Sequence, residues 1–149
     1  MWIYWALMFV LVVIDQLIKS VVVRQIALGA TKTVVPGLLS LTNLHNNGAA
    51  WSILQGKLGF FYLISIVALG VMVYLLWRLR THRLYEFGIV LMIAGTLGNF
   101  IDRIRIGYVV DMFQLDFINF PIFNFADSCL TVGVILILIA VLRDESFDK

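Results

Sequence analysis

The segment "LGFFYLISIVALGVMVYLLW", residues 58–77, contains twenty consecutive residues without a charged side chain. About 20 apolar residues in a helix are enough to cross the roughly 30 Å hydrocarbon core of a bilayer, so this segment predicts a transmembrane helix. The whole chain is 62% hydrophobic and only 13% charged, whereas a soluble domain carries about 25% charged residues. The composition therefore indicates an integral membrane protein.

Three further segments predict transmembrane helices. Two of them cover about residues 2–22 and 84–102. The last is "FNFADSCLTVGVILILIAVL", residues 123–142, in which fifteen uncharged residues follow Asp127. Fifteen helical residues are about 22 Å long, so we expect this span to cover about 127–142 with Asp127 at the membrane boundary. The sequence predicts an all-α integral membrane protein with four spans, in one domain that covers all 149 residues.

Two of the connecting segments have the alternation of apolar and polar residues that is typical of short strands. The first is "TVVPGLLSLTNLHNNGAAW", residues 33–51, which contains a Pro-Gly turn. The second is "YVVDMFQLDFINF", residues 108–120. By contrast, the second and third spans are joined by the short basic stretch "RLRTHR", residues 78–83.

Most polar residues near the predicted spans belong to one face of the membrane, because consecutive spans alternate in direction. Polar groups near hydrocarbon normally face the bundle interior and pair with one another. The set therefore predicts a polar site at one membrane boundary; the alternative is a network of caps and ion pairs that only holds the helices together. Its members are Asp15, Lys19, Asn46, Asn47, Gly48, Asn99, Asp102, Arg103, Asp111, Asp116, Asn124 and Asp127.

The positive-inside rule gives the expected orientation. The site face and the opposite face carry six and five Lys or Arg residues, so the totals do not decide. The stretch 78–83, however, has three arginines within six residues. We therefore expect this stretch and both termini to be cytoplasmic, with segments 23–57 and 103–126 extracytoplasmic.

Several kinds of chemistry are disfavoured. The two histidines, His45 and His82, fall on opposite faces, so a shared zinc site is not expected,. The chain has no H-E-x-x-H or G-x-S-x-G motif,. A net charge of +2 gives no reason to expect nucleic acid as a partner. A serine–lysine pair, Ser52 or Ser128 with Lys19 or Lys57, stays open.

Carboxylates remain as the chemically useful groups. Two aspartates that share a proton have separated pKa values and supply an acid and a base together, as hydrolysis requires. A proton-coupled transporter also uses intramembrane carboxylates, but four spans without a repeat do not favour alternating access. The residues alone leave the choice of pair open. The candidates are Asp15, Asp102, Asp111, Asp116 and Asp127.

Five sequence blocks give the chain a resemblance to a known family. They are "DQLIK" at 15–19, "NNGAAWS" at 46–52, "GTLGNFIDR" at 95–103, "VVD" at 109–111 and "FNFADS" at 123–128. In this order, on a chain with four predicted spans, the blocks resemble those of the bacterial lipoprotein signal peptidases, also called signal peptidase II. The resemblance covers nearly the whole chain.

The resemblance implies an aspartic endopeptidase of the bacterial cytoplasmic membrane, with its site near the extracytoplasmic face. Such an enzyme cuts the signal peptide from a prolipoprotein before a diacylglyceryl-modified cysteine, and it uses no metal or other cofactor. By motif, Asp111 and Asp127 fall on the catalytic pair. The loop before the second span would form a small extracytoplasmic β cradle. The positions that shape or support the site would be Asp15, Lys19, Asn46, Gly95, Asn99, Arg103, Asn124 and Ala126.

One block departs from the family pattern. The family often has G-G-A-x-G-N where this chain has "AGTLGN", residues 94–99. Ala94 and Thr96 are bulkier than the family pattern at these positions, and we expect them to narrow the pocket without changing the assignment. The alternative function is that of a non-enzymatic membrane assembly or binding protein whose polar face docks a partner.

Overall fold

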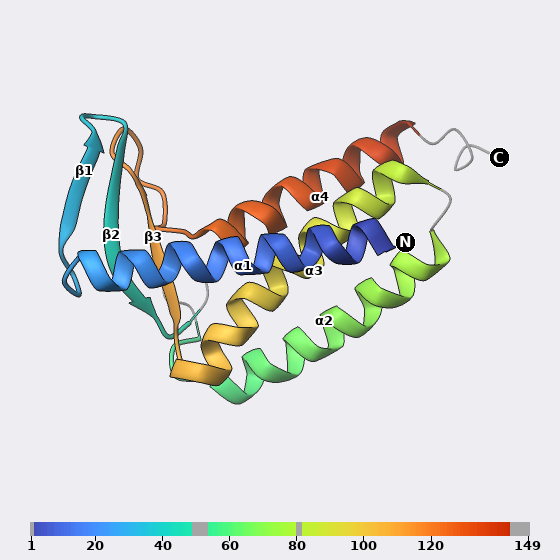
Figure 1. The fold of residues 1–149 in the computed structure, drawn as a ribbon, viewed down its shortest axis with the longest axis horizontal. Helices are drawn as coiled ribbons and strands as arrows, with labels where there is room; N and C mark the ends of the chain where they lie inside the picture. The colour runs from blue at the N-terminus through green and yellow to red at the C-terminus, as the bar shows by residue number, and fades with distance from the viewer. Residues whose placement is uncertain (1, 49–53, 80–81, 144–149) are drawn as a thin grey trace.

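The apolar segments of the chain fold into long helices that cross the molecule in alternating directions, with a small sheet at one end (Figure 1). The computed structural model describes residues 2–48, 54–79 and 82–143. The second half of the block at 46–52, part of the basic stretch at 78–83 and the tail from 144 lie outside the described residues. The elements are α1 (Trp2–Gln25), β1 (Thr31–Val35), β2 (Leu39–Asn46), α2 (Leu58–Arg78), α3 (Arg83–Ile106), β3 (Val109–Leu115) and α4 (Phe125–Arg143).

All four helices are long and apolar enough to cross a membrane. Each contains one of the predicted spans and extends beyond it by at least one residue. The predicted membrane fold, four helices with a small β element, is confirmed. α3 is the central helix, because it packs against each of the other three. In its most apolar window 61% of the residues are buried, compared with 17–22% in α1, α2 and α4.

Glycines allow α3 and α4 to pack closely. A Cβ atom on Gly88 would lie 3.0 Å from the carbonyl oxygen of Gly133, and a Cβ on Gly95 would overlap the carbonyl oxygen of Ala126. Without these side chains the two backbones approach each other directly, as is common where membrane helices pack. The close contact at Gly95 and Ala126 fixes the first turn of α4 against α3.

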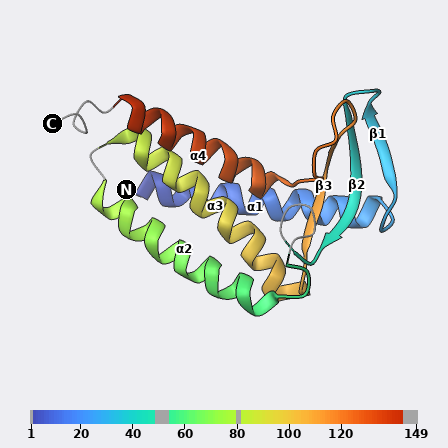
Figure 2. The ribbon, with the colours of Figure 1, turned by 180° about the vertical axis from the view of Figure 1, so that it is seen from behind.

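The sheet has the strand order β1-β2-β3, with both pairs antiparallel. β1 and β2 form an antiparallel hairpin in the first stretch that was predicted to contain short strands, and Gly37 in its turn has a φ of +71°, which favours glycine,. β3 pairs with β2 although α2 and α3 separate the two strands in the sequence. In this pairing Asn46 lies opposite Val109. In both views the sheet lies at one end of the bundle, and the start of α1 and the end of α4 lie at the other (Figure 2).

The expectation about Ala94 and Thr96 is wrong. Ala94 is 2% exposed and belongs to the hydrophobic core that α1, α2 and α3 share, with Met8 and Met72 among its members. The hydroxyl of Thr96 donates to the carbonyl oxygen of Met92 within the same helix, at 2.8 Å. Neither residue lines the pocket described below.

Candidate active site

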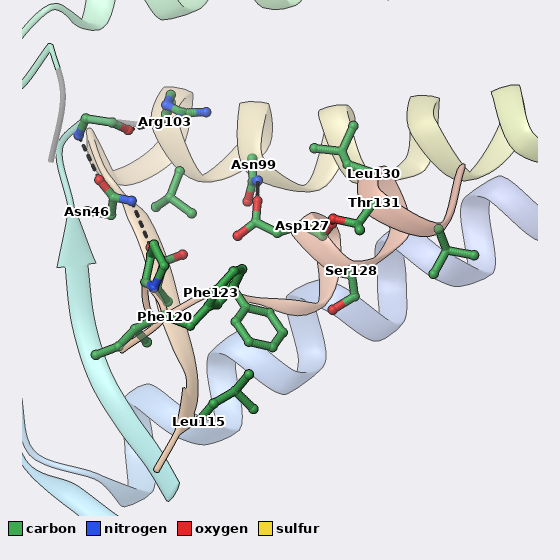
Figure 3. Close-up of a pocket in the computed structure, with 16 residues that line it drawn as sticks. Asn46, Asn99, Arg103, Leu115, Phe120, Phe123, Asp127, Ser128, Leu130 and Thr131 are labelled. Atoms are coloured by element: carbon green, nitrogen blue, oxygen red, sulfur yellow. Dashed lines mark hydrogen bonds between the residues drawn. The ribbon is translucent and has the colours of Figure 1, made fainter. Parts of the chain in front are cut away.

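Asp111 and Asp127 both line a pocket of about 550 Å³ between the bundle and the sheet (Figure 3). Asp111 comes from β3 and Asp127 from the first turn of α4. Apolar side chains line much of the rest, among them Leu115, Phe123 and Leu130. The pocket therefore brings two carboxylates to an apolar surface, and these are the two that the family resemblance implied.

Asp111 is 2% exposed and both of its carboxylate oxygens are occupied. Oδ2 accepts a hydrogen bond from Asn46 Nδ2 at 2.8 Å, and Oδ1 accepts one from Asn124 Nδ2 at 2.6 Å. Burial and the nearby charge of Asp127 raise the pKa of Asp111 from 3.8 to about 6, while the two amides and Lys19 oppose the shift. Asp111 therefore takes up a proton far more readily than an ordinary aspartate.

Asn124 and Asp127 form a capping box at the start of α4. The side-chain Oδ1 of Asn124 accepts from the backbone N–H of Asp127 at 2.9 Å, and Asp127 Oδ2 accepts from the backbone N–H of Asn124 at 3.1 Å. Asn99 Nδ2 donates to the other oxygen of Asp127 at 2.7 Å (Figure 3). Asp127 is thus held by its own helix terminus and by α3.

Asn124 connects the two carboxylates. It is fully buried, and its Nδ2 donates both to Asp111 and to Asn99 Oδ1, the latter at 3.1 Å. Every hydrogen-bonding group of this amide is therefore used. Because Asn124 is bonded to both aspartates, it fixes the position of one relative to the other.

Lys19 is 3% exposed and contacts this hydrogen-bonded group through Asn99. Its ammonium group makes ion pairs with Asp15 at 2.9 Å and Asp102 at 2.8 Å, and it donates to Asn99 Oδ1 at 3.0 Å. A buried ammonium has three donors, and all three are satisfied here. The serine–lysine alternative therefore fails for Lys19, and Ser128 instead donates to the carbonyl oxygen of Asn124. Ser52 lies outside the described residues.

Asp15 and Asp102 do not line the pocket that contains Asp111 and Asp127. Asp15 Oδ1 accepts from the backbone N–H of Ala126 at 3.0 Å, which ties α1 to the start of α4. Asp102 Oδ2 accepts from the backbone N–H of Val110 at 3.3 Å, the residue before Asp111. Each carboxylate therefore holds the backbone next to one of the two pocket aspartates.

Asn46 and Arg103 close the sheet side of the pocket. Arg103 NH2 donates to the carbonyl oxygen of Gly48 at 3.2 Å, and its guanidinium lies 4.5 Å from the centroid of the Phe61 ring. Asn46 Oδ1 accepts from the N–H of Gly48 at 2.9 Å. These contacts hold the described end of the loop after β2 against α3.

The structure separates Asp116 from the other candidates. Asp116 is exposed beyond the end of β3, where its Oδ2 accepts from Ser40 at 2.7 Å. It does not line the pocket.

Two supporting residues, Gln16 and Gly98, were missed from the sequence. Gln16 Nε2 donates to Asp102 at 2.8 Å and to Asp15 at 3.2 Å. A Cβ on Gly98 would lie 2.6 Å from Asp15 Oδ2. Both belong to the quoted blocks, so their position in a motif was the signal that could have found them.

Taken together, the helices, the sheet and the pocket define a multi-pass membrane protein with a paired-carboxylate site at one end of its bundle. The sequence pattern of the family described as "Signal peptidase (SPase) II" matches residues 7–143. The chain therefore belongs to the signal peptidase II family, and it is a membrane-bound protease.

Individual relatives agree with this assignment. A protein of Lactiplantibacillus plantarum named "Lipoprotein signal peptidase" is 78% identical over 149 residues, which is the full length of both chains. One of Enterococcus faecalis with the same name is 51% identical over 99% of this chain and 92% of its own.

Two solved structures share the fold. One, described as "Bacterial membrane enzyme structure by the in meso method at 2.3 A resolution", has a TM-score of 0.94 at 41% identity, covering 100% of this chain and 93% of its own. The other, determined by the same method at 1.9 Å resolution, has a TM-score of 0.87 at 40% identity and covers 97% and 95%.

Proposed function

We propose that the protein is an aspartic endopeptidase in which Asp111 and Asp127 are the catalytic pair. The observation that carries the proposal is that these two carboxylates, from β3 and α4, line one pocket and accept hydrogen bonds from the same residue, Asn124. Its side-chain amide donates to Asp111, and its backbone N–H donates to Asp127. Aspartates that share a site separate their proton affinities, which supplies an acid and a base together. No metal or other cofactor has a role in this chemistry.

The raised pKa of Asp111, about 6, favours it as the holder of the shared proton. Asp127 is then the base. It takes a proton from a water molecule as the water oxygen attacks the carbonyl carbon of the scissile bond, while Asp111 gives its proton to the carbonyl oxygen. When the C–N bond of the resulting diol breaks, the proton on Asp127 passes to the leaving amine. Asp111 takes a proton back from a hydroxyl group of the diol, which becomes the new carboxyl group.

The supporting residues hold this pair in place. Asn99 and Asn124 orient the carboxylates, and Lys19 pairs with both Asp15 and Asp102. In this proposal, Gly95 and Ala126 act through the close contact of α3 with α4. Asn46 and Arg103 act from the sheet side, where the substrate backbone would pass.

The proposed substrate is a prolipoprotein, cut before a cysteine that carries a diacylglyceryl group. The relatives' name and the apolar pocket lining favour this substrate. Each acyl CH₂ that is buried contributes about 0.8 kcal/mol, and the signal helix is already in the membrane. Membrane lipids are therefore expected partners, and nucleic acid is not.

The test is a cleavage assay with purified protein in detergent. A lipidated prolipoprotein should be cut, and the same prolipoprotein with an unmodified cysteine should be cut poorly or not at all. Equal rates would show that acyl burial does not drive binding. No cleavage of either form would instead favour the alternative, a membrane assembly or binding protein.

We also propose that the protein is a single domain of the bacterial cytoplasmic membrane, with the sheet and pocket extracytoplasmic and both termini cytoplasmic. Single cysteines introduced at the exposed positions Lys32 and His82, in a Cys129→Ala background, test the orientation. An impermeant thiol reagent should label the cysteine at position 32 in intact cells. Labelling at position 82 alone would invert the proposed topology.

A further inference from the structure

A second pocket, of about 190 Å³, lies between α1 and α3 near the sheet. Its rim includes Arg24 in the last turn of α1 and Arg105 in the last turn of α3. Val23 and Ile106 beside them are 46% and 44% exposed. No residue lines both this pocket and the one that contains Asp111 and Asp127, so the two sites are distinct.

The rim carries positive charge that the described residues do not balance. Lys19 and Asp102 line the pocket floor, and Lys19 pairs with both Asp102 and Asp15, so these three residues together carry one formal negative charge against the two positive charges of the rim. Arg24 and Arg105 form no ion pair within the described part of the chain, where the ion pairs are those of Lys19. Among the described residues, the Arg105 side chain donates only to the neutral Gln16 Oε1, at 3.1 Å.

We propose that this pocket binds the phosphodiester headgroup of an anionic phospholipid. Guanidinium groups bind phosphate oxygens in bidentate geometry, and here two of them, from two different helices, meet at one hollow. Both arginines lie in the last turn of a helix that is long and apolar enough to cross a membrane, and the proposal places this end of the helices at the depth of the lipid phosphates. Exposed Val23 and Ile106 offer the apolar contact that the glycerol and the first acyl carbons need.

The competing explanation is that the two arginines only complement the negative ends of their helices. A cation in the last turn of a helix stabilises it without any ligand. Arg78 and Arg143 hold the same position in α2 and α4, at the other end of the bundle. The double substitution R78Q/R143Q therefore removes the same charge from the same kind of position and is a matched control.

The experiment is native mass spectrometry of the purified protein in detergent, titrated with palmitoyl-oleoyl phosphatidylglycerol or with the uncharged phosphatidylcholine of the same chains. The natural protein should retain phosphatidylglycerol preferentially. R24Q/R105Q should bind it at least about tenfold more weakly, since each charge-assisted contact is worth a severalfold change in affinity. R78Q/R143Q should stay within about twofold of the natural protein.

Equal loss in both double variants, or no loss in R24Q/R105Q, would overturn the proposal. Arg24→Gln alone decides the matter if the double variant does not fold, because Arg24 has no hydrogen bond to lose among the described residues. That variant should bind phosphatidylglycerol about three- to tenfold more weakly. Inorganic phosphate at the same concentration should not displace the lipid; displacement would mean that the site takes free phosphate instead. Lipid binding is measured without cleavage, so this result is independent of the proposed peptidase activity.

Discussion

Asn124 and Asp127 exchange two hydrogen bonds across the first turn of α4, one from each backbone N–H to the other residue's side chain. Asp127 therefore belongs to the cap of the helix and also provides a carboxylate of the pocket. Any movement of Asp127 also breaks the terminus of its helix, which makes the carboxylate a rigid part of the site.

Asp111→Asn and Asp127→Asn should each nearly abolish cleavage of a lipidated prolipoprotein. The change keeps the size of the side chain but removes the group that carries a proton, and loss of a positioned acid or base costs about 10²–10⁴-fold. The double variant should be little worse than either single one, because the pair acts as a unit. The measurement is kcat/KM from the mobility shift of the substrate.

Asp116→Asn is the matched control for this loss. Asp116 bonds to Ser40 beyond the end of β3 and does not line the pocket, so the variant should keep most of its activity. A collapse of activity in Asp116→Asn with normal rates in Asp111→Asn would show that the wrong carboxylates have been paired.

Activity should fall on the alkaline side as pH rises through about 6. The free enzyme needs the proton of Asp111, whose pKa is raised to about 6, and kcat/KM reports groups of the free enzyme,. Asn46→Ala removes a hydrogen bond that lowers this pKa, so the alkaline limb of the profile should move to higher pH. Ser40→Ala, on the same strand, should leave it in place. A shift to lower pH in Asn46→Ala would contradict the assignment.

The pH dependence of unfolding should also change in Asp111→Asn. The folded pKa of Asp111, about 6, lies above its usual value of 3.8, so the natural protein loses stability as pH rises from about 4 to 6,. The variant cannot lose this contribution. Its Tm relative to the natural protein should therefore increase over that interval, by the equivalent of about 2–3 kcal/mol at most. Thermal unfolding in detergent, followed by tryptophan fluorescence, measures the difference; a constant difference would mean that Asp111 titrates normally.

Gly98→Ala should lower both stability and activity, although Gly98 does not line the pocket. The added Cβ would meet Asp15 Oδ2 at 2.6 Å, and Asp15 holds the backbone of Ala126. Overpacking of this kind costs about 1–3 kcal/mol. Gly70→Ala in α2 is the control, because nothing lies within 4 Å of its Cβ position. Tm and kcat/KM of the two variants should diverge, and equal behaviour would remove Gly98 from the support of the site.

The membrane helices could be predicted because hydropathy and length determine them locally. The β1-β2 hairpin was also visible, since its alternation and its Pro-Gly turn lie within one short stretch. The pairing of β2 with β3 could not be predicted, because α2 and α3 separate these two strands in the sequence. No local pattern records which distant strand completes a sheet.

The site was predictable only in part. The alternating directions of the predicted spans put the aspartates on one face of the membrane. They could not separate Asp111 from Asp116, because these two residues differ in their contacts in the folded protein. That choice came from the family resemblance. The Asn124–Asp127 cap has a local signature, an N-cap residue followed three positions later by an acid. Gln16 bonds to Asp102 on α3, a contact that depends on the fold, so its place in the block at 15–19 was the one sequence signal for its role.

The pairing of β2 with β3 also has a consequence for how the molecule is made. β2 leaves the ribosome before α2 and α3. It therefore cannot pair with β3 until both of these helices have entered the bilayer. Lys19 likewise has only Asp15 to neutralise it until α3 brings Asp102. The pocket gains Asp127 last, with α4. If Asp111 and Asp127 are the catalytic pair, as proposed, the cleavage centre is therefore complete only once α4 has been made.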